Sequence, residues 1–192
     1  MGSSQADKAA NHERIVKTAS RRMRRDGIDS VSVAELMNES GLTHGGFYRH
    51  FDSRDDLVAE AVAAALSAGS QRIQVAAQLD SPEALAAIID GYLSPLHRDK
   101  PETGCAVAAL PADITRSNSR ARTAYSRQVR SYIELLAELT PAHDADEAHL
   151  ILAALVGALV LARAVDDRGL SDDMLESVAR ALHRHVEHAD QV

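Results

Sequence analysis

The chain has 192 residues, of which 45% are hydrophobic but only 3% aromatic, and it carries a formal net charge of −7. Its 34 alanines, with only ten glycines and five prolines, favour helices and exclude a β-sandwich, a barrel, a collagen-like repeat and a disordered polar chain. A single cysteine excludes a disulfide framework and a multi-thiolate metal site, as is typical of proteins from a reducing cytoplasm. The chain opens without a signal-peptide pattern, and the longest uncharged apolar run, 150–162, is too short to span a bilayer.

Helix stop and start signals divide the first half of the chain into five predicted helices. Gly27 and Gly41 are typical helix stops, and Ser32 followed by Glu35 forms a capping-box pattern. Ser53 is a second cap, with acidic residues in the turn that follows it. The predicted helices cover residues 9–26, 32–40, 43–51, 53–77 and 81–96.

The second half begins with a predicted loop at 99–104, followed by a short apolar segment, 105–110, that Pro111 should kink or end. Apolar residues spaced by three or four then predict a helix over 119–139. Two further helices are expected at 145–167 and 172–189, hinged at 168–171. The whole chain is therefore predicted to be all-α, with about nine helices and no strand.

The segment most informative about function is 31–57, VSVAELMNESGLTHGGFYRHFDSRDDL. It reads as a helix, a tight turn at Gly41 and a second helix, which is the helix-turn-helix arrangement of DNA-binding proteins. Gly45 and Gly46 weaken the second helix by about 1 kcal/mol each, which makes sense if its backbone must press against another surface. Residues 11–51 carry a local charge of +2 within an acidic chain, so the charge leaves DNA binding open.

Residues 12–60 resemble the TetR family of bacterial transcriptional regulators. The resemblance rests on V-A-E-L-x-x-x-S-G-L, T-H-G-G-F-Y-R-H-F and S-R-D-D-L, and Arg54 stands where the family usually has lysine. It implies that Phe47 and Phe51 are core residues that hold the recognition helix. It also implies phosphate contacts from Thr43, Tyr48, His50 and Arg54, and positions near base edges for His44, Gly45 and Arg49. For the arginines of the first helix, 21, 22, 24 and 25, we expect mostly solvated side chains.

The resemblance further implies a DNA-binding domain, 1–52, and a ligand-binding and dimerisation domain, 53–192. The stretch 150–162 is apolar all round, as in a helix buried on every side. It is either part of a four-helix dimer interface or the central core helix of one protomer. The candidate interface residues on the last two helices are Leu155, Leu159, Leu175, Val178 and Leu182.

The middle of the chain is expected to hold an effector cavity lined by aliphatic residues and a few tyrosine hydroxyls. The candidates are Ile89, Tyr92, Cys105, Tyr125 and Tyr132. Cys105 follows a glycine and begins a short helix, which favours the thiolate form and allows a redox or electrophile sensor; a buried hydrophobe is the alternative. Arg72 and Arg163 lie at the edges of apolar faces, with a surface role or an acidic ligand as their alternatives.

The predicted function is a repressor that binds a palindromic operator in double-stranded DNA as a homodimer and is released by a small-molecule effector. The alternatives are sensing through Cys105 and a regulator with no small-molecule effector. No catalytic motif is present, so an enzyme is not expected, and neither is a cofactor or a metal site. The expected location is the bacterial cytoplasm, on the nucleoid when DNA is bound, with no membrane partner.

Overall fold

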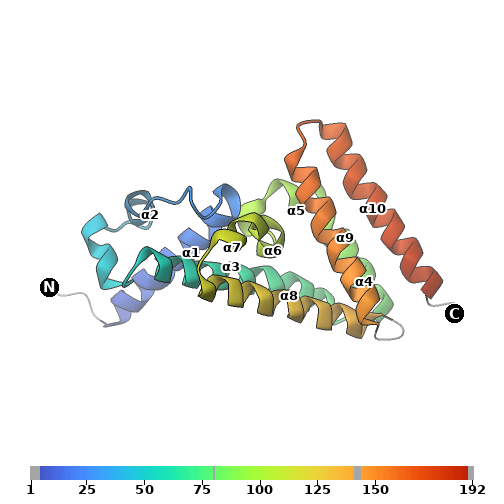
Figure 1. Cartoon of the computed structure of the whole chain (residues 1–192), viewed down its shortest axis with the longest axis horizontal. Helices are drawn as coiled ribbons and strands as arrows, with labels where there is room; N and C mark the ends of the chain where they lie inside the picture. Colours follow the sequence, from blue (N-terminus) through green and yellow to red (C-terminus); the bar gives the residue numbers. More distant parts are fainter. Residues whose placement is uncertain (1–4, 80, 141–143, 190–192) are drawn as a thin grey trace.

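The structure is a computed structural model that describes residues 5–79, 81–140 and 144–189 (Figure 1). Throughout these ranges the chain forms helices joined by turns and loops, without a strand. The prediction of an all-α protein is confirmed.

The N-terminal part contains α1 (Gln5–Asp26), α2 (Val33–Glu39) and the 3-10 helix η1 (His44–Arg49), followed by the long helix α3 (Arg54–Ala76). The predicted glycine stops are confirmed, since Gly27 has a φ of 89° and Gly41 a φ of 72°, which side chains disfavour. Ser53 caps α3 by accepting a hydrogen bond from the Asp56 amide at 3.1 Å. The capping box is wrong: α2 begins after Ser32, but the Ser32 side chain makes no capping bond.

Short helices in the middle of the chain raise the number above the nine expected. The predicted helix 81–96 is broken before Pro95, because proline lacks an amide hydrogen and disfavours helix in the residue before it. Ser94 then caps the new helix by accepting from the His97 amide at 3.2 Å. The elements here are α4 (Ser81–Tyr92), α5 (Pro95–Asp99), η2 (Pro101–Thr103), α6 (Ala106–Ala109) and α7 (Pro111–Arg116).

Three long helices, α8 (Ser119–Leu139), α9 (Ala145–Ala164) and α10 (Arg168–Ala189), complete the fold. In Figure 1, α3 and α8 run side by side along the molecule, and α9 packs with α10 at the end farthest from α2. The break between α9 and α10 falls at 165–167, slightly before the predicted hinge.

Helix α9 has 20 residues and contains an 18-residue window with a mean hydropathy of 1.8, so by length and composition alone it could cross a membrane. The expectation that the uncharged run 150–162 is too short to span a bilayer did not count the rest of this helix, on which that run lies. In the fold, however, Ile151, Leu155 and Leu159 are at most 1% exposed and pack in the central core. One side of α9 therefore packs in the core of the helical domain, and its other side stays exposed.

Candidate nucleic-acid interface and internal cavity

Two phenylalanines fix η1 to the rest of the N-terminal part. Phe47 and Phe51 are 2% and 3% exposed, and their rings stack with centroids 5.4 Å apart. His12 of α1 stacks on Phe51 at 4.6 Å, and its Nε2 lies 2.7 Å from Glu60 Oε2 on α3. The aromatic cluster thus joins η1 to α1 and α3, so that η1 moves with its supporting helices.

The opposite side of η1 is open. Tyr48 is 76% exposed, and Thr43, His44, Gly45 and Arg49 are also exposed. A Cβ added to Gly45 would meet no atom within 4 Å, so internal packing does not require glycine there. Gly45 therefore leaves a flat backbone surface between side chains that can donate hydrogen bonds to phosphates.

A surface groove of about 630 Å³ runs between η1 and the beginning of α1. Lys8 and Asn11 of α1 line it together with Thr43, Tyr48 and Arg49. The sequence analysis missed Lys8 and Asn11 because both precede the segment that carries the family resemblance. The one available signal was helical spacing, which places Lys8 one turn before His12.

His50 and Arg54, two of the expected phosphate contacts, also interact with other parts of the protein. His50 is half-buried, and its Nδ1 has no hydrogen-bond partner. Burial lowers its pKa, and the neighbouring His12, Lys8 and Arg49 lower it further. Arg54 donates to the Ile28 carbonyl at 2.9 Å and lies 3.7 Å from Asp29 Oδ1.

The expectation of mostly solvated arginines on α1 holds for Arg21 and Arg25, which are exposed, but not for Arg22 and Arg24. Arg22 pairs with Glu35 at 3.1 Å and with Glu39 at 3.6 Å, and so ties α1 to α2. Arg24 is only 6% exposed, and its Nη1 donates to the Gly104 carbonyl at 3.1 Å. The expectation fails for Arg24 because its position on α1 faces η2, against which α1 packs.

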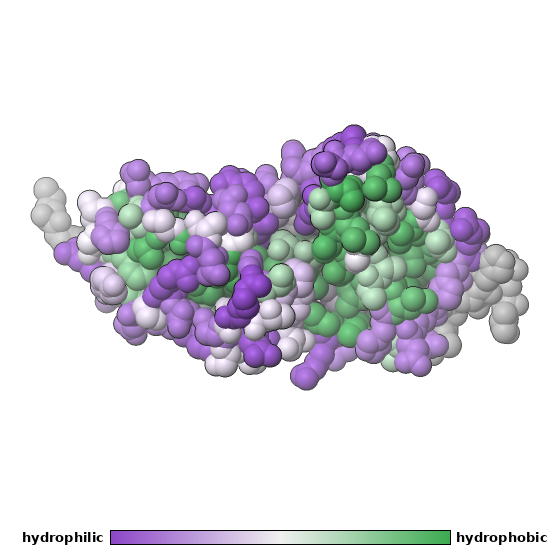
Figure 2. All heavy atoms as spheres, turned by 45° about the horizontal axis from the view of Figure 1, so that its top comes forward, coloured by the Kyte–Doolittle hydropathy of each residue, from purple (hydrophilic) through white to green (hydrophobic). Residues whose placement is uncertain are grey.

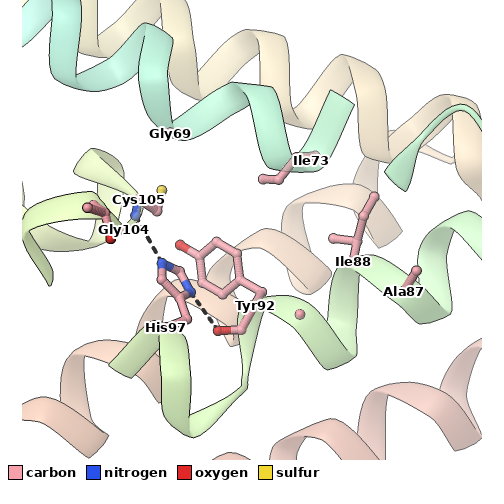
Figure 3. A pocket seen from close by; sticks show the side chains of 10 residues that line it. Gly69, Ile73, Ala87, Ile88, Tyr92, His97, Gly104 and Cys105 are labelled. Carbon is pink, nitrogen blue, oxygen red and sulfur yellow. Dashed lines mark hydrogen bonds between the residues drawn. The ribbon is translucent and has the colours of Figure 1, made fainter. Parts of the chain in front are cut away.

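Gly104 also lines an internal cavity of about 90 Å³. The cavity lies between α3, α4, α5 and the segment before α6 (Figure 3). Tyr92, His97 and Cys105 form one end of it, and Ile73, Ala87 and Ile88 form the apolar side, with Gly69, Gly91 and Thr103 completing the described lining.

The structure brings only Tyr92 and Cys105 of the predicted ligand residues to the described lining of this cavity. Ile89 is fully buried in the core. The Tyr125 hydroxyl donates to the Val107 carbonyl at 2.8 Å, and the Tyr132 hydroxyl lies 3.9 Å from Cys105 Sγ, behind the cavity wall. Helical spacing could not distinguish the inward-facing tyrosine from the other two.

Arg163 reaches the same region from α9 and donates hydrogen bonds to the His97 and Arg98 carbonyls. The side chain of Arg72 lies outside the described part of the structure.

Four of the predicted dimer residues are buried within one chain: Leu155, Leu159, Leu175 and Leu182 are at most 5% exposed, and Val178 is partly buried. Packing within one chain therefore accounts for the apolar pattern of these residues.

Residues 15–61 match the model of the bacterial regulatory proteins of the tetR family. A TetR-family transcriptional regulator from Agrobacterium tumefaciens has 21% identity and a TM-score of 0.78, covering 93% of this chain and 98% of its own. A TetR transcriptional regulator from Chloroflexus aurantiacus has 22% identity and a TM-score of 0.79, with 95% and 97% covered. NemR from E. coli, in its reduced form, has 18% identity and a TM-score of 0.78, with 91% and 96% covered. No curated protein matches the sequence.

Proposed function

We propose that the protein is a cytoplasmic repressor. It carries the DNA-binding segment of the TetR family, and its fold is that of solved TetR-family regulators. In this proposal a homodimer binds a palindromic operator, and a small molecule in the internal cavity releases it. The observation that carries the proposal is the exposed η1 surface around Gly45 and Tyr48, held from behind by buried Phe47 and Phe51. A rigidly supported surface rich in hydrogen-bond donors suits insertion into a DNA groove.

Selection of genomic fragments by the purified protein tests this function directly. We expect recovery of a pseudo-palindromic site whose two halves lie about 34–36 Å apart along the DNA. Affinity should fall steeply with salt, because each phosphate contact releases a counterion. Weak binding without sequence preference, persisting after the protein is unfolded and refolded to remove any co-purified ligand, would contradict the proposal.

Operator binding should strengthen as the pH falls from about 8 to about 6, because His50 gains a proton in the complex. In the free protein the pKa of His50 is lowered by burial and by its positive neighbours. A nearby DNA phosphate favours the charged form and raises that pKa, so the complex binds more protons than the free protein. Each unit of difference in pKa between the two states gives about tenfold in affinity once the pH is below both values.

Fluorescence anisotropy with labelled operator, measured across this pH range at fixed salt, checks the prediction. The variant His50→Gln should bind with a flatter pH dependence, and His44→Gln, which alters an exposed histidine of the same segment, serves as the matched comparison. An identical pH slope in wild type and His50→Gln would assign the dependence to another group.

The proposed dimer interface is the exposed face of α9. Leu150 and Leu161 are 54% and 51% exposed, and the small residues Ala153, Gly157 and Ala164 lie on the same face. Figure 2 shows hydrophobic surface gathered over the end of the molecule that contains α9 and α10. A second copy is the occupant that fits, because one recognition segment reads too few bases, whereas a symmetric pair reads two half-sites.

Replacing Leu161 with glutamate should convert the dimer to a monomer and weaken operator binding by at least about tenfold. A charge buried in an apolar interface without a partner costs several kcal/mol, whereas at this exposed position of one protomer it costs little. Light scattering checks that the dimer becomes a monomer, and thermal unfolding checks that the substitution costs a single protomer little stability. Leu96→Glu is the control, since Leu96 is 63% exposed on α5, outside the proposed interface. A Leu161→Glu variant that stays dimeric would exclude this face.

Two hydrogen bonds connect the DNA-binding part to the region of the cavity. Arg24 Nη1 donates to the carbonyl of the cavity residue Gly104, and the Ile28 amide donates to Asp113 Oδ2 of α7 at 3.1 Å. A ligand that displaces residues 103–105 would therefore move the end of α1, on which η1 depends. The ligand can change DNA affinity only by as much as its own affinity differs between the two conformations.

The similarity to NemR, a structure described as a reduced form, supports a thiol-based regulator as the second candidate. Cys105 lines the cavity but is only 4% exposed, and α6, which follows it, has four residues. Oxidant access would therefore require the cavity to open. Release from the operator by hydrogen peroxide in the wild type but not in Cys105→Ser would favour this candidate.

A further inference from the structure

The polar end of the cavity is organised by a histidine that has no capacity left for a ligand. His97 Nδ1 lies 2.7 Å from the Tyr92 carbonyl oxygen. Because a carbonyl oxygen can accept a hydrogen bond but cannot donate one, this nitrogen carries a proton. His97 Nε2 lies 2.9 Å from the Cys105 amide, which donates to it, so this nitrogen is unprotonated. His97 is therefore neutral, with both ring nitrogens engaged, and it acts as a structural link between α5 and the segment before α6 (Figure 3).

The hydroxyl of Tyr92 is the first donor at this end that has no acceptor. Tyr92 is 5% exposed, and its ring packs edge-on against His97 with centroids 4.7 Å apart. Its hydroxyl lies toward Gly104 and Cys105, near the thiol but with no hydrogen-bond partner of ordinary geometry (Figure 3). Burial raises the pKa of this phenol well above its usual value, so the group remains a donor at neutral pH. A buried donor without an acceptor costs about 1–3 kcal/mol.

The second donor is the Nη1 group of Arg163, which is buried and has no partner. The other nitrogens of this guanidinium donate to backbone carbonyls, Nε to Arg98 at 3.1 Å and Nη2 to His97 at 2.6 Å. Among the described residues no carboxylate forms an ion pair with Arg163. Burial lowers the pKa of Arg163, and the more distant carboxylates of Asp99 and Glu102 oppose part of this shift without bonding to the guanidinium.

Gly104 brings this charge next to the cavity. A Cβ built on Gly104 would lie 3.0 Å from Arg163 Nη2 and 2.9 Å from the His97 ring, so there is no space for a side chain between the guanidinium and the cavity wall. Arg163 itself does not line the cavity, but its positive charge lies behind Gly104, close enough to act on the Tyr92 hydroxyl at the polar end. An unsatisfied donor next to a positive charge favours an anionic acceptor.

We propose that the cavity binds a small aliphatic monocarboxylate. One carboxylate oxygen accepts the hydrogen bond of Tyr92, Arg163 balances the negative charge, and the alkyl chain lies along Ile73, Ala87 and Ile88. A dry protein cavity of about 150 Å³ holds benzene, which has six heavy atoms, so a cavity of about 90 Å³ suits a carboxylate of about two or three carbons. This inference rests on the proposed function, because it names the chemical class of the effector.

Calorimetric titration of the full-length protein with sodium propionate, in the absence of DNA, tests the proposal. Propionamide, which has the same shape without the charge, is the matched probe. We expect saturable binding of propionate, at least about tenfold tighter than propionamide. Tyr92→Phe should weaken propionate binding by about tenfold to hundredfold, since a hydrogen bond to a charged group is lost. Tyr125→Phe should bind as the wild type does, because Tyr125 already bonds to Val107 outside the described lining.

Arg163→Met should abolish the preference for propionate over propionamide, and Arg163→Lys, which retains the charge, should keep part of it even if the methionine variant does not fold. Equal binding of the two probes to the wild type, no binding of propionate, or an unchanged affinity in Tyr92→Phe would each overturn the inference. A protein that binds an operator but not propionate contradicts only this ligand class, whereas one that binds propionate but no DNA contradicts the proposed function.

Discussion

Replacing Gly45 with leucine is expected to weaken operator binding by about tenfold to hundredfold without lowering the melting temperature. The Cβ position of Gly45 meets nothing within 4 Å, so the folded protein has room for the new side chain. In the complex the same side chain would stand between η1 and the DNA, and forcing extra methylene groups into a close-packed contact costs about 1–3 kcal/mol. Anisotropy titration with operator DNA, together with thermal unfolding, measures the two effects separately.

Two further variants show whether the effect belongs to the surface of η1. Gly41→Leu should lower stability and DNA affinity together, because Gly41 has a φ of 72°. Tyr48→Ala should weaken DNA binding at unchanged stability, since Tyr48 is 76% exposed and supports little of the core. Full operator affinity in Gly45→Leu would mean that η1 does not approach the DNA through its backbone.

The long helices and the helix-turn-helix could be predicted from the sequence because their signals are local. Apolar residues recur at helical spacing through α8, and the stops at Gly27 and Gly41 depend only on the backbone freedom of glycine. The burial of Phe47 in η1 and of Phe51 just after it followed from their place in a recognisable motif. For these features, neighbouring residues in the sequence determine the outcome.

The cavity could not be predicted in the same way because its residues come from several helices. Tyr92, Tyr125 and Tyr132 were all predicted on helices, but of the three only Tyr92 lines the cavity. The burial of Arg24 depends on Gly104, 80 positions away. The apolar stripes of α9 and α10 were similarly ambiguous, since packing within one protomer and packing between protomers produce the same pattern.

Replacing Arg24 with methionine should uncouple the cavity from the DNA-binding part. Coupling between two sites is reciprocal, so if a ligand in the cavity alters DNA affinity, bound DNA must alter the cavity by the same factor, typically about 5-fold to 150-fold. In the wild type, saturating operator DNA should therefore change the hydrogen exchange rate of the Cys105 amide, which donates to His97. In Arg24→Met the bond to Gly104 is lost, and that change should largely disappear although the DNA still binds.

This measurement needs no knowledge of the natural effector, because the DNA itself is the ligand that is varied. Arg24→Met should also lower the free energy of unfolding by about 1–3 kcal/mol, since the Gly104 carbonyl is left without its donor. Arg25→Met is the matched control: Arg25 is the next residue on the same helix, but it is exposed and pairs with Asp26 on its own helix. If DNA changed the exchange of Cys105 equally in wild type and Arg24→Met, the coupling would have to run through another contact, and the bond between Ile28 and Asp113 is the next to test.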